Sequence, residues 1–152
     1  MGLPNPTPGL VISYAYLWRD EALRGQEEGR KDRPCVIVLS VQTEIGETIV
    51  TVVPVTHSPP SHPESALEIP PQTKKRLGLD TQRSWMIAAD LNRFVWPGVD
   101  LRAIKRGSAD YAYGELPEAL YRQLRDKVLT LARAGRAGIT RRSTLTVSDG
   151  FI

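Results

Sequence analysis

Two short segments combine an arginine and a hydroxyl group in a pattern suited to binding phosphate. Arg33 stands just before an apolar run, and Thr56 directly follows a valine-rich run, residues 48–55. A short glycine-containing turn separates the two runs, which is the pattern of a β-hairpin, so both side chains are expected at the same end of a sheet. An arginine fork beside a hydroxyl group favours phosphate binding there. The alternative is a surface arginine paired with Asp32 or Glu28, and a threonine that bonds to its own turn.

The two histidines and the single cysteine are the other reactive residue types. His57 follows Thr56, and an imidazole is a ready general base or acid near pH 7. The alternative for His57 is an ordinary exposed position in the proline-rich loop 57–63. Neither His57 nor His62 has a cysteine or an acidic cluster nearby, so no metal site is expected. Cys35 opens an apolar run and is expected to be a small core residue rather than a nucleophile.

Hydrophobic patterning predicts a mainly β protein that must position these residues. Strands are expected at residues 10–18, 35–39, 48–55, 66–69, 84–89, 93–96 and 99–104. A charged loop is expected at residues 19–32, and a helical turn at 72–77 that ends at Gly78. Pro54 cannot donate a ladder hydrogen bond, so it should lie at a strand end, an edge or a bulge.

One long helix is expected near the end of the chain, with Pro117 at its first position and Gly135 at its end. Four apolar side chains recur there at helical spacing and form a single stripe: Leu120, Leu124, Val128 and Leu131. The predicted architecture is a small, curved antiparallel sheet closed by this one C-terminal α-helix.

Composition is consistent with one domain of modest positive charge. The chain has 152 residues, a formal net charge of +3, twelve glycines, twelve prolines and one cysteine. The predicted organisation is an N-terminal arm at residues 1–9, a single domain at 10–135 and a basic tail at 136–152. No glycine-rich phosphate loop is present, and neither a membrane span nor a signal peptide is expected.

Four segments resemble the MazF/PemK (Kid) toxins of toxin–antitoxin systems. The first two are E-x-x-x-x-R-P, here Glu28 to Pro34, and V-P-[IV]-T, here residues 53–56. The segment A-D-L-N-R at 89–93 is similar to the family's A-D-Q-x-R, and Y-G-E-L-P-E at 113–118 is similar to its helix entry. The four segments keep the family's order across residues 9–134.

This resemblance implies an SH3-like small barrel with one long C-terminal α-helix, usually a homodimer. It implies a cytoplasmic growth inhibitor, without membrane association, that cleaves single-stranded mRNA at specific sequences. Cleavage would need no metal or other cofactor, because the ribose 2′-OH attacks the adjacent phosphate and leaves 2′,3′-cyclic phosphate and 5′-hydroxyl ends. The implied partner is a cognate antitoxin, a DNA-binding protein with a flexible acidic tail, so the toxin reaches DNA only through it.

Site residues follow from the matching motifs. Arg33 would stabilise the charge on the pentacoordinate phosphate and Thr56 would orient the reacting groups. Leu10 and Ala88 stand where the family often has an aspartate and an arginine, which leaves the proton-transfer group unassigned, and we hypothesise that His57 supplies it. The expected RNA-binding residues are Glu28, Lys31, Ser58, Asp90 and Arg93.

Several of these assignments have structural alternatives. Glu28 and Lys31 could shape the loop beside the site, while Asp90 and Arg93 could be a turn aspartate and an exposed cation. The three tryptophans could stack bases or pack in the core or in a dimer: Trp18, Trp85 and Trp96. Basic residues crowd the helix and tail and suit an acidic antitoxin tail or RNA equally well: Arg122, Arg125, Lys127, Arg133, Arg136, Arg141 and Arg142.

The alternative function is a non-catalytic SH3-like binding protein of the same fold, similar to the gyrase-poisoning toxins or to a regulatory protein or nucleic-acid binder. The missing arginine at Ala88 and the insertions at residues 19–32 and 57–65 favour this alternative. Arg33 and Thr56, which keep their register, favour the enzyme.

Overall fold

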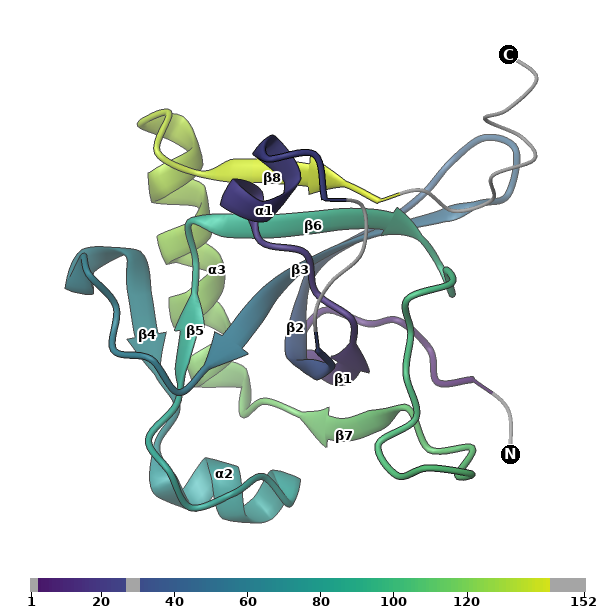
Figure 1. Ribbon diagram of the computed structural model, residues 1–152, viewed down its shortest axis with the longest axis horizontal. Coiled ribbons are helices and arrows are strands. Elements are labelled where there is room, and N and C mark those ends of the chain that lie inside the picture. Colours follow the sequence, from purple (N-terminus) through teal and green to yellow (C-terminus); the bar gives the residue numbers. More distant parts are fainter. Residues whose placement is uncertain (1–2, 27–30, 143–152) are drawn as a thin grey trace.

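A long central hairpin organises the sheet (Figure 1). The computed structural model describes residues 3–26 and 31–142. In it, β2 (Arg33–Gln42) and β3 (Thr48–Thr56) pair antiparallel around the turn at residues 43–47. Gly46 in this turn has φ +89°, a conformation that side chains disfavour and glycine allows. The predicted hairpin is therefore confirmed, with strands a few residues longer than expected.

Six further strands surround the hairpin: β1 (Leu10–Tyr14), β4 (Ala66–Glu68), β5 (Trp85–Ile87), β6 (Asp90–Val95), β7 (Ala112–Glu115) and β8 (Gly138–Arg141). The pairing order is β4-β5-β3-β2-β1-β7, and β6 joins β3 to β8. All pairs are antiparallel except β6 with β8. The path is open at β4 and β7, so these strands do not form the closed barrel that was expected.

Pro54 lies where β3 changes its neighbour. Residues Ile49 to Val52 of β3 pair with β6, whereas Val55 and Thr56 pair with β5. Pro54 falls between the two ladders, where a missing backbone N–H breaks no regular pairing on that side. Pro54 therefore lies near the end of β3, one of the positions predicted for it, at a gap in the pairing on one side of the strand.

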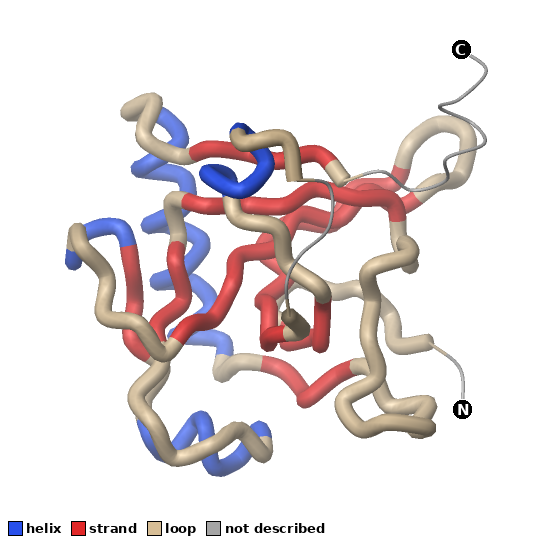
Figure 2. The backbone as a smooth tube through the Cα atoms, viewed as in Figure 1, coloured by secondary structure: helices blue, strands red, loops and turns tan. Residues whose placement is uncertain are grey.

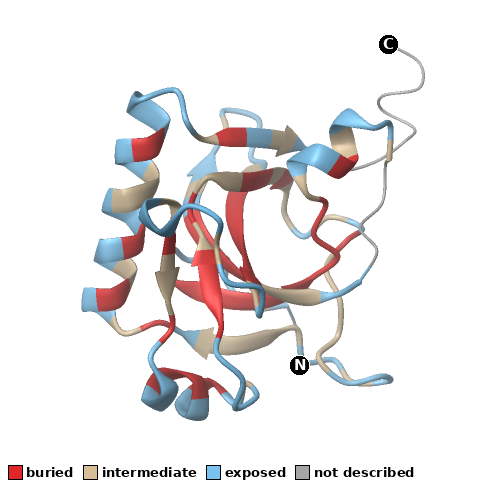
Figure 3. Ribbon diagram, turned by 60° about the vertical axis from the view of Figure 1, so that its left-hand side comes forward, coloured by how far each residue is buried: buried red, intermediate tan, exposed pale blue. Residues whose placement is uncertain are grey.

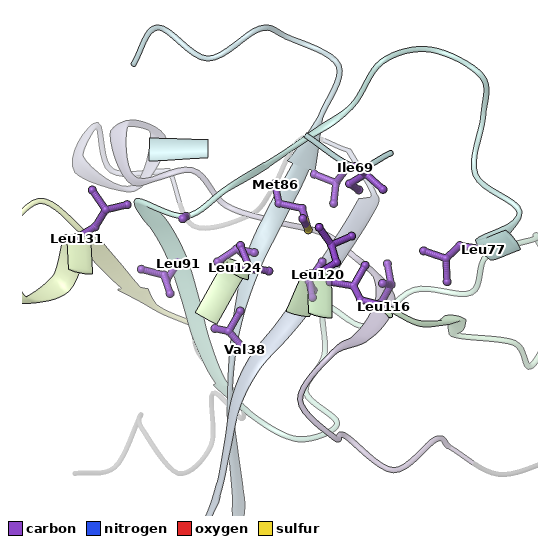
Figure 4. Close-up of a cluster of buried hydrophobic side chains, with 14 residues drawn as sticks. Val38, Ile69, Leu77, Met86, Leu91, Leu116, Leu120, Leu124 and Leu131 are labelled. Atoms are coloured by element: carbon purple, nitrogen blue, oxygen red, sulfur yellow. The ribbon is translucent and has the colours of Figure 1, made fainter. Parts of the chain in front are cut away.

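The central strands are buried on both faces, which explains their continuous apolar runs. Alternate residues point to opposite faces of a strand, so Val11, Val36 and Val53 contribute to a core beneath the long helix. Figure 4 draws the buried side chains of this helix-side core and labels nine of them. The residues next to these three valines in the sequence contribute to a second, aromatic core with Tyr14 and Phe94. Figure 3 shows these strands buried in the middle of the molecule.

Cys35 belongs to the aromatic core and is fully buried, as expected for a small core residue. Burial raises the pKa of its thiol well above the ordinary range, because a buried thiolate loses its hydration. The thiol is therefore inert as a nucleophile.

The predicted long helix is α3 (Glu118–Arg133), which begins after Pro117. Its buried residues are Leu120, Leu124 and Leu131, three members of the expected stripe. Two shorter helices are α1 (Arg19–Leu23) and α2 (Pro71–Leu77), and Pro63–Ser65 forms one turn of 3₁₀-helix. α2 ends at Gly78 in the left-handed conformation, as predicted. No helix in the described residues is both long and apolar enough to cross a membrane.

Two expectations about local structure were wrong. Residues 19–32 do not form only a loop, because α1 begins after Trp18, whose N–H donates to Glu21 Oε1. The strand expected at 99–104 is absent apart from a single bridge between Leu101 and Tyr14. The chain instead descends from β6 to β7 as an irregular loop, seen in tan in Figure 2, whose Ile104 N–H bonds back to the Asp110 carbonyl.

The segment expected to be a basic tail contributes β8 and a buried arginine. β8 lies parallel to β6, with Leu91 opposite Ile139. Nη1 of Arg142 donates to the Ala15 carbonyl at 2.8 Å and to Asn92 Oδ1 at 2.9 Å. Its Nη2 lies 3.0 Å from Asp100 Oδ2. These partners come from three distant segments, which is why local sequence did not reveal the burial.

Candidate active site

A cavity of about 830 Å³ lies at the open end of the β2–β3 hairpin. Its walls come from the segment that enters β2, the end of β3 with the loop that follows, and the turn after α2. Trp18, Ile87, Ile104, Lys105 and Tyr113 complete the lining. This volume falls within the usual ~300–1,000 Å³ of sites for small ligands. The cavity can therefore hold a nucleotide-sized group.

The hairpin register brings Arg33 and Thr56 together at this cavity. Arg33 is the first residue of β2 and Thr56 is the last of β3. Cys35 pairs with Pro54, two residues inward from each of them. Both side chains line the cavity, so the prediction that they share one end of the sheet is confirmed.

The guanidinium of Arg33 is held on two sides. Nη1 donates to the Val55 carbonyl oxygen at 3.3 Å, and the guanidinium carbon lies 5.2 Å from the centre of the Trp18 ring. Nε of Arg33 is buried without a hydrogen-bond partner among the described residues. Asp32, one alternative ion-pair partner, instead lies 3.6 Å from Arg102. A guanidinium fixed in this way is suited to a phosphate group.

The side chain of Thr56 bonds to its own turn, which the sequence offered as the alternative to phosphate binding. Its Oγ1 accepts the Ser58 N–H at 3.1 Å. A threonine hydroxyl has a second lone pair and one proton to donate. The turn therefore orients the side chain and leaves its O–H donor available to a ligand in the cavity.

His57 is paired with an acidic residue that sequence reasoning missed. Its Nε2 lies 2.7 Å from Oδ2 of Asp80, and both side chains are about half exposed. The other carboxylate oxygen, Oδ1, accepts a hydrogen bond from Nζ of Lys74 at 2.7 Å. This bond is the main reason that the pKa of Asp80 is lowered, with the charge of Lys74 and then that of His57 adding to it. Nothing in the linear spacing of residues 57, 74 and 80 indicates this arrangement.

The loop after His57 is tied to the far end of α3. Nη2 of Arg136 donates to Glu64 Oε2 at 2.8 Å, and Nζ of Lys127 donates to the Glu64 carbonyl at 3.1 Å. The pKa of Glu64 is lowered, mainly by the Arg136 hydrogen bond. Two of the basic residues expected to face RNA or an antitoxin therefore hold a loop that forms one wall of the cavity.

The charged lining of the cavity has a small excess of positive charge. Lys31, Arg33 and Lys105 face it with two acids, Asp32 and Asp80. Ser58 and His62 line it as well. Lys31 and Ser58 are thus beside Arg33 and Thr56, as predicted, whereas Glu28 lies outside the described residues. Such a lining attracts anions.

Asp90 and Arg93 do not reach the cavity. Asp90 accepts a hydrogen bond from Tyr16 Oη at 2.5 Å and one from the Arg19 N–H at 3.3 Å. Burial raises the pKa of Asp90, although both hydrogen bonds oppose the shift. Arg93 lies within β6, half-buried, opposite Thr51. Asp90 is an internal acceptor that joins β6 to the start of α1, and RNA contact by Asp90 or Arg93 stays a prediction.

The three tryptophans divide between the two expected roles. Trp18 lines the cavity beneath Arg33. Trp85 is buried in β5, and Trp96 packs against the aromatic core, 6.2 Å from the Phe94 ring. Packing is therefore the role of Trp85 and Trp96, and only Trp18 of the three lies where a base could approach.

Within residues 3–26 and 31–142, no group of three or more histidine, cysteine or acidic residues is arranged to hold a metal ion. No model of a known protein family matches the sequence, and no curated protein matches it.

Proposed function

We propose that this chain is a MazF/PemK-like endoribonuclease that cleaves single-stranded RNA without a metal ion. One observation carries the proposal: Arg33, Thr56 and His57, separated by up to 24 positions in the chain, line a single cavity with Lys31 and Lys105. A phosphate-binding fork, a hydroxyl donor and an imidazole are together sufficient for transfer of a phosphoryl group to a neighbouring 2′-oxygen.

The reaction forms a bond between the 2′-oxygen and phosphorus and breaks the bond between phosphorus and the 5′-oxygen. His57 in its neutral form takes the proton of the 2′-OH, and the departing 5′-oxygen takes up a proton from water. The protonated His57 then returns its proton to the hydroxide that is left, which restores the neutral imidazole. Arg33 and the Thr56 hydroxyl donate to the non-bridging phosphate oxygens, whose negative charge grows in the transition state. The products are a 2′,3′-cyclic phosphate and a 5′-hydroxyl.

The rest of the cavity supports binding rather than bond breaking. Lys31 and Lys105 attract the phosphate backbone. Trp18 and Tyr113 provide aromatic surface beside the phosphate position, which suits single-stranded bases. A flexible acidic tail of a cognate antitoxin would be attracted by the same charges.

The proposed family relationship also implies an SH3-like fold. The curved sheet around β3, with α3 over one face, is an open variant of the SH3-like architecture. The active unit is a homodimer in the cytoplasm that inhibits growth until the antitoxin covers it.

A non-catalytic binding protein is the second candidate, and Ala88 favours it. Ala88 stands where some toxins of the family have an arginine, and it is 0% exposed. A buried alanine cannot supply a functional cation, so this chain either uses His57 or does not cleave RNA.

Incubation of the purified protein with single-stranded RNA in EDTA separates the two candidates. We expect the wild type to produce fragments with 2′,3′-cyclic phosphate ends and Arg33→Ala to be slower by about 100-fold or more. Arg24→Ala, a substitution of an exposed arginine at the end of α1, is the matched control and should cleave like the wild type. Absence of cleavage by the wild type, or equal cleavage by Arg33→Ala, contradicts the proposed enzyme.

A further inference from the structure

Lys74 is a buried lysine next to the candidate active site. It lies in α2 and is only 4% exposed. Lysine is almost never buried unless its ammonium group is paired. Nζ has three acceptors: Asp80 Oδ1 at 2.7 Å, Ser84 Oγ at 2.6 Å and the Gln82 carbonyl oxygen. All three belong to the turn that follows α2, so the lysine holds that turn against the helix.

This turn presents Asp80 to His57 with its two oxygens used differently. Oδ1 accepts hydrogen bonds from Lys74 Nζ and, at 3.1 Å, from the Gln82 N–H. Oδ2 is left for Nε2 of His57, 2.7 Å away. Two donors on one oxygen fix the plane of the carboxylate, and the plane fixes where the second oxygen lies.

An ionised carboxylate can only accept a hydrogen bond, so Nε2 of His57 must carry the hydrogen. In a neutral imidazole the other nitrogen, Nδ1, is then an acceptor. Among the described residues, no hydrogen bond occupies Nδ1. The lone pair of Nδ1 is therefore available for a proton of the substrate.

The structure assigns Lys74 and Asp80 as positioning residues: Lys74 fixes the Asp80 carboxylate, and Asp80 holds His57 as the Nε2–H tautomer with Nδ1 as the proton acceptor. This inference rests on the proposed ribonuclease function for its consequence in catalysis. The tautomer itself is a property of the free protein and does not depend on that function.

The charges around Asp80 keep its carboxylate ionised. The groups that face it are Lys74 from α2, His57 from the loop after β3 and Tyr113 from β7, while Lys31, Asp32, Arg33, Lys105 and His62 line the same cavity. The hydrogen bond from Lys74 is the main cause that lowers the pKa of Asp80. The pKa of Tyr113 is raised, chiefly by burial, with Asp80 among the smaller causes. Near neutral pH, Asp80 is thus a charged acceptor beside a neutral phenol.

The test uses ring-nitrogen NMR shifts of His57 in the free protein at a pH where the imidazole is neutral. We expect the wild type to show a fixed Nε2–H tautomer, and both Lys74→Met and Asp80→Asn to show the tautomer mixture of a free imidazole. Arg83→Met is the matched control, because it breaks another hydrogen-bonded ion pair of the same segment, that of Arg83 with Glu68 at 2.8 Å, without touching Asp80. It should keep the wild-type shifts.

A second measurement follows the ionisation of the Asp80 carboxyl group directly. The carboxyl carbon of Asp80 should titrate at a higher pH in Lys74→Met than in the wild type, because the main cause of its lowered pKa is gone. Unchanged His57 nitrogen shifts in Asp80→Asn, or an unchanged Asp80 titration in Lys74→Met, overturn the inference. If Lys74→Met does not fold, Asp80→Asn carries the test alone, since the asparagine oxygen can still accept from Lys74 Nζ, whose other two acceptors, Ser84 Oγ and the Gln82 carbonyl, are unchanged.

Measurement of RNA cleavage distinguishes a failure of this inference from a failure of the proposed function. We expect Asp80→Asn to lower kcat for RNA cleavage by about 10- to 100-fold with KM within about twofold of the wild type. A wild type that cleaves no RNA overturns the proposed function. The NMR shifts of the free protein still test whether Asp80 positions His57. A wild type that cleaves RNA together with a fully active Asp80→Asn overturns the positioning role and leaves the proposed function in place.

Discussion

Nη1 of Arg33 donates a hydrogen bond to the carbonyl oxygen of Val55, 3.3 Å away, across the open end of the β2–β3 hairpin. The bond joins the first residue of one strand to the last but one residue of its neighbour. It holds the guanidinium beside Thr56 before any ligand is present, while Trp18 supports its flat face. A cation held in this way needs little reorganisation when phosphate arrives, which is the usual source of electrostatic catalysis.

Arg33→Lys tests whether RNA cleavage needs the planar N–H donors of the guanidinium or only its positive charge. Lysine keeps the positive charge but has no planar pair of donors and does not stack on Trp18 in the same way. We expect cleavage of a labelled RNA oligonucleotide to slow by about 100-fold. The control is Arg24→Lys, at an exposed arginine at the end of α1. Activity of Arg33→Lys within about threefold of the wild type would show that a point charge is enough.

Thr56→Val removes a hydroxyl and keeps the shape of the side chain. The substitution deletes the donor to the phosphate and the acceptor of the Ser58 N–H, so we expect the cleavage rate to fall by about 10-fold or more. Thr56→Ser keeps the hydroxyl and should retain most of the activity. Single-turnover cleavage rates of the two variants check this. Equal rates for Val and Ser would exclude a role for the hydroxyl in the reaction.

Leu124→Ala tests how α3 is attached to the sheet. Leu124 is 0% exposed in the helix-side core, so its truncation should lower the free energy of unfolding by about 2–5 kcal/mol. Leu129 lies on the same helix and is 43% exposed, so Leu129→Ala should cost about 0.5 kcal/mol or less. Urea denaturation of both variants measures the difference. Similar losses for the two would contradict this packing of the helix.

Asp90→Asn tests the buried carboxyl group through the pH dependence of stability. Burial raises the pKa of Asp90 in the folded state above its unfolded value, so folding favours the protonated form. The contribution of Asp90 is greatest below the unfolded pKa, about 3.9, and declines as the pH rises through the folded pKa. Between about pH 7 and about pH 4, the wild type should therefore gain stability relative to Asp90→Asn as the pH falls.

Urea denaturation of both proteins at several pH values measures that trend. Asp110→Asn, at an exposed aspartate of the loop before β7, is the control for the loss of one carboxyl group. A wild type that loses stability relative to Asp90→Asn over the same interval would contradict the direction of the pKa shift.

The hairpin and its end residues were predictable because their contacts are local. A turn of five residues joins β2 to β3, so the alternation of side chains and the strand lengths together determine that Arg33 and Thr56 lie at one end. The stripe on α3 was predictable for the same reason, since helical periodicity is a property of neighbouring residues. The short strands β7 and β8 were missed because neither has a regular apolar alternation.

The partners of the site residues were decided by tertiary structure. Asp90 stands in a motif that suggested RNA binding, but it is bonded to Tyr16, 74 residues earlier. Arg142 seemed part of a polar tail, but Asn92, Asp100 and the Ala15 carbonyl meet around it. Such groups are buried only because their partners converge from separate segments of the chain, and the local sequence around each group contains none of those partners.

By itself, the sequence determined the mainly β class, the central hairpin, the amphipathic helix and the pairing of an arginine with a threonine at one strand end. Only the tertiary structure decided that the sheet stays open, that Asp90 and Arg93 do not line the cavity, and that Asp80 contacts both Lys74 and His57. The physical reason is the range of the interactions. Periodicity and turn chemistry act over a few residues, whereas the Lys74–Asp80–His57 chain depends on how α2 packs beside the end of β3.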